Sequence, residues 1–260
     1  MRAVSATSSA GWSEATMTRC ATAQGEGAVA GRAISPFHAI TPFTMLDYPG
    51  RIACILWIAG CNMRCLYCHN PQIVTGRGTI GEEQALAFLR KRKGLLEGVV
   101  FSGGEATTWP GLAAFMARVK ALGYAIKLDT NGLRPDVIAR LLDRNLLDRV
   151  ALDYKAPRDK FRTVTGASAF ARFARSLDLL CGQDRIPVEV RSTIHSDLLG
   201  EEDILDMARD LSRRGYRGTY ALQRAIAGPD RPTLGDLPPN PHPFDTVRLA
   251  RLSPLELTVR

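Results

Sequence analysis

The sequence predicts an α/β fold in which a parallel sheet curves into a partial barrel of six βα units. Three observations support this. From residue 50 onward, short apolar runs alternate with helical patterns. Six such runs are three-quarters of the strands of a closed eight-stranded barrel. The polar residues that stand out follow directly after these runs, and barrel enzymes build their active sites at that end of the strands. A doubly wound open sheet is the competing architecture.

The predicted strands are short and rich in Val, Ile, Leu and aromatic residues, as buried strands are. Strands that alternate with helices imply parallel pairing with right-handed crossovers. The predicted strands cover residues 52–59, 98–102, 125–129, 149–154, 188–194 and 218–222.

The predicted helices fill the intervals between these strands. Acidic residues follow Gly81 and Gly200, in first turns where the helix dipole favours them. Gly94, Gly123 and Gly215 stand where C-terminal caps are expected. The predicted helices cover residues 81–93, 111–122, 135–143, 169–181 and 200–213.

The two ends of the chain differ from this repeating middle. Residues 1–35 are rich in Ser, Thr, Ala and Gly without periodicity, so we expect a disordered extension, and Met17 is an alternative start. A transit peptide is a weaker interpretation of the same composition. Residues 36–227 form the predicted barrel. The Pro-rich tail, residues 228–260, is expected to pack on the barrel or to extend it.

Cysteines stand in a C-x3-C-x2-C pattern at Cys61, Cys65 and Cys68, directly after the first predicted strand. Iron–sulfur clusters normally use four cysteines. Three thiolates would leave one iron of a cubane without a protein ligand, and a small molecule could bind there. A structural zinc site usually needs four N/S ligands, often on two separated knuckles, and only one knuckle is present. The remaining cysteines are isolated, and we expect Cys54 to be a buried apolar residue.

Composition narrows the class of protein further. The formal net charge is +8, but the basic residues are scattered, so no nucleic-acid footprint is evident. The longest apolar stretch, residues 52–60, is far too short to span a bilayer. Six cysteines in 260 residues do not make a disulfide scaffold. We therefore expect a soluble, cytoplasmic protein in a reducing compartment.

The cysteine motif, with Tyr67 before its last cysteine, resembles the signature of the radical S-adenosylmethionine superfamily. Its context, residues 45–50 and 60–71, is similar to glycyl-radical-enzyme activases, as are Asp-Thr-Asn-Gly at 129–132 and Asp-Tyr-Lys at 153–155. The chain most resembles the activating protein of anaerobic ribonucleoside-triphosphate reductase. The resemblance runs from about Thr41 to Gln223, most of the predicted barrel.

This resemblance implies a partial barrel of the radical SAM type and an anaerobic activity. A [4Fe–4S] cluster on the three cysteines would chelate S-adenosylmethionine and cleave it reductively. The resulting 5′-deoxyadenosyl radical would take a hydrogen atom from a glycine of a partner enzyme. Only about 34 residues separate Cys68 from Gly103, so no second cluster domain fits there. Flavodoxin or ferredoxin would then be the electron donor.

The resemblance also implies roles for single residues. Gly103, Gly104 and Glu105 match a Gly-Gly-Glu segment whose acid grips the methionine amine, although Ala106 stands where the family usually has Pro. Asp129, Thr130 and Asn131 match residues near the methionine and ribose portions, with a bound monovalent cation in some members. A simple helix-entry turn is the alternative for this segment.

Further along the chain, Asp153 and Lys155 match the activase Asp-x-Lys pair, and an ordinary surface salt bridge is the alternative. Arg191 is expected to pair with the cosubstrate carboxylate, a planar bidentate match, or to form a structural ion pair. Tyr67 is expected against adenine. His195 and Gln223 are weaker candidates.

Two other classes of function compete with the activase. One is a radical enzyme that acts on a small molecule, similar to 7-carboxy-7-deazaguanine synthase. The other is a zinc-binding interaction module without turnover. A glycyl radical on an added reductase separates the activase from the first rival, and the metal content separates it from the second.

Overall fold

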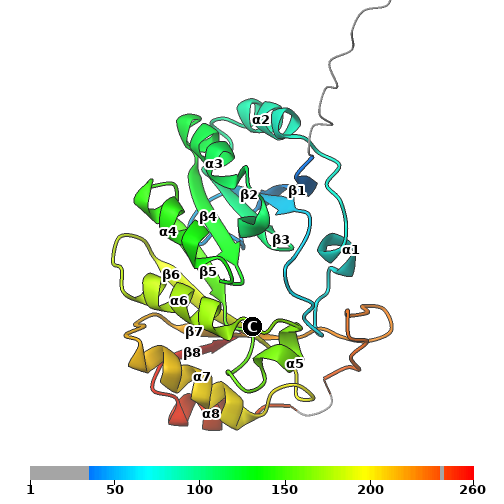
Figure 1. Cartoon of the computed structure of the whole chain (residues 1–260), viewed down its shortest axis with the longest axis vertical. Helices are drawn as coiled ribbons and strands as arrows, with labels where there is room; N and C mark the ends of the chain where they lie inside the picture. The colour runs from blue at the N-terminus through cyan, green and yellow to red at the C-terminus, as the bar shows by residue number, and fades with distance from the viewer. Residues whose placement is uncertain (1–34, 241–242) are drawn as a thin grey trace, which may run out of the picture. The chain divides into compact units, whose positions relative to one another are not determined.

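The computed structural model describes residues 35–240 and 243–260, so the expected disordered extension lies outside the described residues except for Ser35. Within residues 34–260 the strands form one sheet whose spatial order is the order of the sequence (Figure 1). The first pair is antiparallel and every later pair is parallel. The strands are β1 (Phe37–Thr44), β2 (Ala53–Ile58), β3 (Gly98–Gly103), β4 (Ala125–Thr130), β5 (Arg149–Asp153), β6 (Val188–Ile194), β7 (Tyr220–Arg224) and β8 (Leu257–Val259).

The six predicted strands are confirmed as β2 to β7, with boundaries shifted by no more than two residues. The strand order never reverses, so the sheet has no topological switch point and is not doubly wound. The structure adds a strand at each edge of the sheet. Leu257–Val259 pairs with β7, so the tail extends the sheet.

The five predicted helices are confirmed, and four short helical segments join them. At the start of α2 the Gly81 N–H donates to Gln84 Oε1 at 2.8 Å, and at α7 the Gly200 N–H donates to Asp203 Oδ2 at 2.6 Å. The helical elements are α1 (Pro71–Val74), α2 (Glu82–Lys91), the 3₁₀ turn η1 (Ala106–Thr108), α3 (Leu112–Ala121), α4 (Pro135–Asp143), α5 (Phe161–Thr165), α6 (Phe170–Cys181), α7 (Glu201–Arg213) and α8 (Thr246–Leu252).

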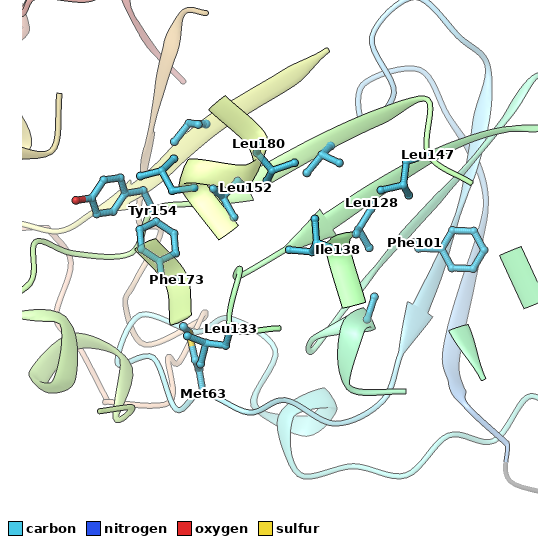
Figure 2. Packing of buried hydrophobic residues seen from close by; sticks show 14 of the residues in the cluster. Met63, Phe101, Leu128, Leu133, Ile138, Leu147, Leu152, Tyr154, Phe173 and Leu180 are labelled. Carbon is cyan, nitrogen blue, oxygen red and sulfur yellow. The ribbon is translucent and has the colours of Figure 1, made fainter. Parts of the chain in front are cut away.

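The main core lies between the sheet and the helices. Leu128 of β4 and Leu152 of β5 are fully buried there together with Ile138 of α4 (Figure 2). Each such side chain stabilises the fold by about 1.5–3 kcal/mol when it leaves water. Alternation along a strand sends the neighbouring side chains to the opposite face.

That opposite face is apolar near the strand starts and polar near the strand ends. Tyr48, Ile55 and Val100 form a small separate cluster at the starts. Further along β4, Lys127 and Asp129 share this inner face because they alternate with the buried Ile126 and Leu128. The interior of a barrel is usually filled by bulky branched residues. Here the part of the interior near the strand ends is charged, which marks that part as a place for a polar ligand.

No helix within residues 35–240 and 243–260 is long and apolar enough to cross a membrane.

Candidate active site

The cysteine loop begins where β2 ends and is tied down by backbone hydrogen bonds to two distant segments. The N–H of Leu66 donates to the carbonyl of Val164 at 3.0 Å, in α5. From the tail, the Leu234 N–H donates to the carbonyl of Cys68 at 3.0 Å, and the Gly235 N–H donates to that of Leu66 at 2.8 Å. The loop is therefore fixed on both sides before any ligand binds.

Cys61, Cys65 and Cys68 line one cavity of about 170 Å³ together with Tyr67. All three thiols are free. Burial raises the pKa of Cys61 and raises that of Cys65 to about 11, so cluster binding has to displace protons from these thiols. Cys54 lies in the core between sheet and helices, and Cys20 lies outside the described residues.

The three thiols supply a set of sulfur donors in one cavity. In the described part of the chain, no group of three His, Cys, Asp or Glu side chains is arranged to hold a single metal ion. Thiolates are the usual ligands of iron–sulfur clusters, which normally use four. Three cysteines therefore suit such a cluster with one position left open.

The glycine pair at the end of β3 allows two loops to touch. A Cβ on Gly103, whose φ is +125°, would lie 2.3 Å from the carbonyl oxygen of Ile58. A Cβ on Gly104 would lie 2.0 Å from the carbonyl oxygen of Gly60. Only glycine permits this approach, which sets the Glu105 loop directly against the cysteine loop.

Glu105 is almost completely buried and joins the ends of β3 and β4. Its Oε1 accepts from the Thr107 N–H at 3.0 Å and from the hydroxyls of Thr107 and Thr130 at 2.5 and 2.8 Å. Among the described residues its Oε2 accepts only from the Asn131 N–H, at 2.6 Å. Burial raises the pKa of this carboxyl in spite of these hydrogen bonds. Oε2 thus keeps the capacity to accept one more donor.

Asn131 connects this acid to the cysteine loop. Its Nδ2 donates to Asn62 Oδ1 at 2.7 Å. The segment Asp129–Gly132 is therefore more than a helix-entry turn, because it links the ends of β3 and β4 to the loop that carries the thiols.

Five charged side chains form a continuous chain across the ends of β4, β5 and β6. Lys127 Nζ lies 2.5 Å from Asp129 Oδ1, and Arg191 Nη2 lies 3.3 Å from Asp129 Oδ2. Arg191 Nε lies 2.5 Å from Asp153 Oδ1, and Lys155 Nζ lies 3.0 Å from Asp153 Oδ2. Arg191 is thus held between two carboxylates.

At Asp153 and Lys155, mutual attraction outweighs desolvation. Burial alone would raise the pKa of Asp153, but Arg191 and Lys155 lower it below its ordinary value. Burial alone would lower the pKa of Lys155, but Asp153 raises it. Asp153 and Lys155 are therefore ionised at neutral pH.

Tyr67 lies between the thiols and these charges. Lys155 Nζ is 5.7 Å from the centre of the Tyr67 ring, a cation–π distance. The Tyr67 hydroxyl is buried and has no hydrogen-bond partner among the described residues. Burial also raises its pKa. A buried hydroxyl without an acceptor is uncommon, and this one belongs to a residue that lines the thiol cavity.

A second cavity of about 380 Å³ adjoins the first. The predicted residues that line both are Gly103, Gly104, Asn131, Asp153 and Lys155. Every site residue predicted from the sequence, apart from the weaker candidate His195, lines one of the two cavities. Those in the second cavity alone are Glu105, Asp129, Thr130 and Arg191. The weaker candidate Gln223 also lines it.

His195 does not belong to the site. It is fully buried, its Nε2 lies 2.9 Å from the carbonyl oxygen of Pro238, and its Nδ1 accepts from the Asp197 N–H.

Other lining residues were missed by sequence reasoning. Trp57 and Thr193 line the cavities without belonging to a recognised motif, and Asn70 lies in the recognised flank of the cysteine motif but was given no role. Alternation offers a signal for two of them, because Trp57 shares a face with Ile55 and Thr193 shares a face with Arg191. Lys127 carries the same signal through Asp129.

The structure is an open βα barrel with three free thiols and the buried Glu105 at the carboxyl ends of its strands. This is the arrangement of an enzyme with an iron–sulfur cluster that has one coordination position open. Residues 55–211 match the Radical SAM superfamily. The chain belongs to that superfamily, whose members use a [4Fe–4S] cluster and S-adenosylmethionine (AdoMet).

Several relatives carry functional names. "Putative glycyl-radical enzyme activating enzyme MJ1227" of Methanocaldococcus jannaschii is 33% identical over 195 residues, which are 71% of this chain and 78% of that protein. "Pyruvate formate-lyase-activating enzyme" of Clostridium pasteurianum is 31% identical over 137 residues, 50% of this chain and 56% of that protein. "Probable GTP 3',8-cyclase" of Saccharolobus solfataricus is 28% identical over 138 residues, 52% of this chain and 45% of that protein. The chain thus spans only about half the length of the last two.

Among solved structures, Streptococcus suis SuiB bound to the precursor peptide SuiA superimposes with a TM-score of 0.59 at 11% identity. The match covers 79% of this chain and 48% of that one. At this identity the likeness concerns the fold alone, and it agrees with the partial barrel.

Proposed function

We propose that this protein is a radical AdoMet activase that generates a glycyl radical on a partner enzyme, with anaerobic ribonucleoside-triphosphate reductase as the partner. The observation that carries the proposal is the extended similarity to a relative named as a glycyl-radical-enzyme activating enzyme, which covers 78% of that protein. Three thiols, a buried acid and a row of charged side chains lie together where the strands of the barrel end. These are the groups that the chemistry needs.

In this proposal Cys61, Cys65 and Cys68 would each hold one iron of a [4Fe–4S] cluster. The cluster would supply the one electron that cleaves AdoMet reductively to methionine and a 5′-deoxyadenosyl radical, and hydrogen abstraction from a glycine Cα would convert that radical to 5′-deoxyadenosine. The electron comes from an external reductant, flavodoxin or ferredoxin.

The chain's own residues would orient AdoMet. Glu105 Oε2 has one donor and can accept another from the methionine ammonium. Arg191 uses Nε and Nη2 within the protein, while its Nη1 has no partner among the described residues, so this end can meet the methionine carboxylate. Tyr67 lies at the cavity wall, where adenine can pack. Asp153 and Lys155 shape the same wall.

The rival is a radical enzyme for a small substrate, either cyclase-like or similar to 7-carboxy-7-deazaguanine synthase. The similarity to the GTP cyclase favours this class, but it covers less than half of that protein. The activase similarity extends further along both chains.

The test is electron paramagnetic resonance on the anaerobically reconstituted protein mixed with AdoMet, reduced flavodoxin and the purified reductase. We expect a glycyl signal on the reductase and one 5′-deoxyadenosine for each radical formed. Cys61→Ala should lose iron and the signal, whereas Cys54→Ala, a matched change in the core, should keep both. AdoMet cleavage without a glycyl signal would favour the small-molecule rival, and no cleavage at all would refute both.

A further inference from the structure

Lys127 is a buried cation that the roles above leave unused. It lies in the middle of β4, and its side chain is 3% exposed. Its Nζ lies 2.5 Å from Asp129 Oδ1, and Asp129 is its only hydrogen-bond partner among the described residues. A buried lysine is costly unless it is paired, and the Asp129 carboxylate provides that pairing.

The charges around Lys127 leave little place for an added metal cation. The two carboxylates, Asp129 and Asp153, face three cations, Lys127, Arg191 and Lys155. Each of the four carboxylate oxygens already has a cationic partner, and Asp129 Oδ2 also accepts from the Ser102 hydroxyl at 3.2 Å. Hard metal cations are held by several oxygen ligands. Here such an ion would first have to displace an ammonium or guanidinium group.

We infer that Lys127 is an internal counter-cation, which takes the place of the monovalent metal ion expected at this position from the resemblance. Its ammonium neutralises Oδ1 of Asp129, so that Oδ2 is left to orient Arg191. Arg191 is then fixed between Asp129 and Asp153 with its Nη1 free. Lys127 is thus a positioning residue that acts on the ligand through two others, and AdoMet binding needs neither Na⁺ nor K⁺.

This inference rests on the proposed assignment of the cavity to AdoMet and is independent of the protein substrate. Its test therefore uses AdoMet binding and folding, and its failure is distinct from the absence of a glycyl radical.

The experiment measures the dissociation constant of AdoMet by equilibrium dialysis against the reconstituted protein, in choline, sodium and potassium chloride at equal ionic strength. For the wild type we expect the three values to agree within about twofold, well below the tenfold change that marks the loss of one strong interaction. The thermal midpoint of the cluster-free protein, read in the same three salts, should likewise be unchanged.

Variants complete the test. Lys127→Ala should bind AdoMet about tenfold more weakly in choline, and K⁺ or Na⁺ should restore part of the binding and raise the thermal midpoint. Lys127→Arg, which keeps the charge, should bind without added metal. Lys120→Ala is the matched control. Lys120 lies on α3, outside both cavities, and its Nζ is 2.8 Å from Asp148 Oδ2.

Two results would overturn the inference. One is a wild-type affinity that rises by about fivefold or more when Na⁺ or K⁺ replaces choline. The other is a Lys127→Ala protein that binds AdoMet in choline as tightly as the wild type. The wild-type comparison needs no variant, so it decides the question even if Lys127→Ala does not fold.

Discussion

The carboxylate of Glu105 accepts four hydrogen bonds from inside the protein, from Thr107, Thr130 and Asn131. All four bonds come from N–H or O–H donors, so both oxygens of the carboxylate act as acceptors. It therefore fixes the mouth of the barrel as well as offering Oε2 to a ligand. Both roles depend on the same side chain being ionised.

We predict that Glu105→Gln lowers the free energy of unfolding by about 1–3 kcal/mol. The new amide N–H₂ must face either the three donors at the Oε1 position or the Asn131 N–H, so at least one donor meets another donor. Urea unfolding of the cluster-free protein measures the change. Glu97→Gln is the matched control, because exposed Glu97 accepts a single bond, from the Ile52 N–H at 2.9 Å, and its amide can rotate. Equal losses in the two variants would contradict the role of Glu105.

At the scale of residues, the sequence predicted the candidate functional side chains better than it predicted their hydrogen-bond partners. Cys61 and Glu105 were predicted because they follow apolar runs within motifs, whereas Arg191 was predicted from its place inside the strand at 188–194. Lys127 was missed because, inside the run Ala125–Thr130, its alternation with Asp129 is the one sign that it faces a charged interior. That Glu105 bonds to Thr130, 25 residues away, is set by the pairing of β3 with β4, which no local pattern encodes.

At the scale of elements, the site depends on two loops that leave neighbouring strands and touch. The Gly104 N–H donates to the carbonyl of Ile58 and the Glu105 N–H to that of Gly60, both at 2.9 Å. The contact extends the pairing of β2 with β3 beyond the strands. The position of the thiols is therefore coupled to that of Glu105.

We predict that Gly104→Ala destabilises the fold by about 1–3 kcal/mol, as overpacking does, and lowers the iron retained after reconstitution. The added Cβ would lie 2.0 Å from the Gly60 carbonyl oxygen, so backbone must move next to Cys61. Urea unfolding and iron analysis measure the two effects. In Gly81→Ala the nearest atom to the new Cβ is 3.6 Å away, and we expect no change in either. Normal iron content in Gly104→Ala would refute the coupling.

Elements with regular periodicity were predictable, and irregular ones were not. Strand β1 was missed because Pro42 interrupts it, and proline argues against a strand except at an edge or a bulge. β1 has both features, since it is the edge strand and its register shifts between Thr41 and Thr44. The helices α1 and α5 are too short to show a period, and β8 is three residues long.

At the scale of the described chain, the C-terminal tail returns to the cysteine loop. It contributes none of the three thiols, yet the N–H groups of Leu234 and Gly235 donate to the carbonyls of Cys68 and Leu66. The side chain of Thr233 holds this turn by accepting from the Leu237 N–H at 2.9 Å. Segments more than 160 residues apart in the sequence thus meet at the site, and composition alone could not show which surface the tail covers.

We predict that Gly235→Ala speeds the loss of a bound cluster while leaving the rest of the fold intact. Its Cβ would lie 2.8 Å from the Cβ and Cδ2 atoms of Leu66, so the tail must lift from the loop. A cost of about 1 kcal/mol corresponds to about a fivefold shift toward the open loop. Iron release to a chelator under anaerobic conditions measures this rate.

The matched control is Gly200→Ala, where the new Cβ meets nothing closer than 3.6 Å, at the start of α7. Its iron release should equal that of the wild type, and circular dichroism should show both variants folded. If Gly235→Ala releases iron no faster than this control, the tail does not stabilise the thiol loop. The loop would then owe its position to α5 and to the contact at Gly104, and shortening the tail would leave the cluster in place.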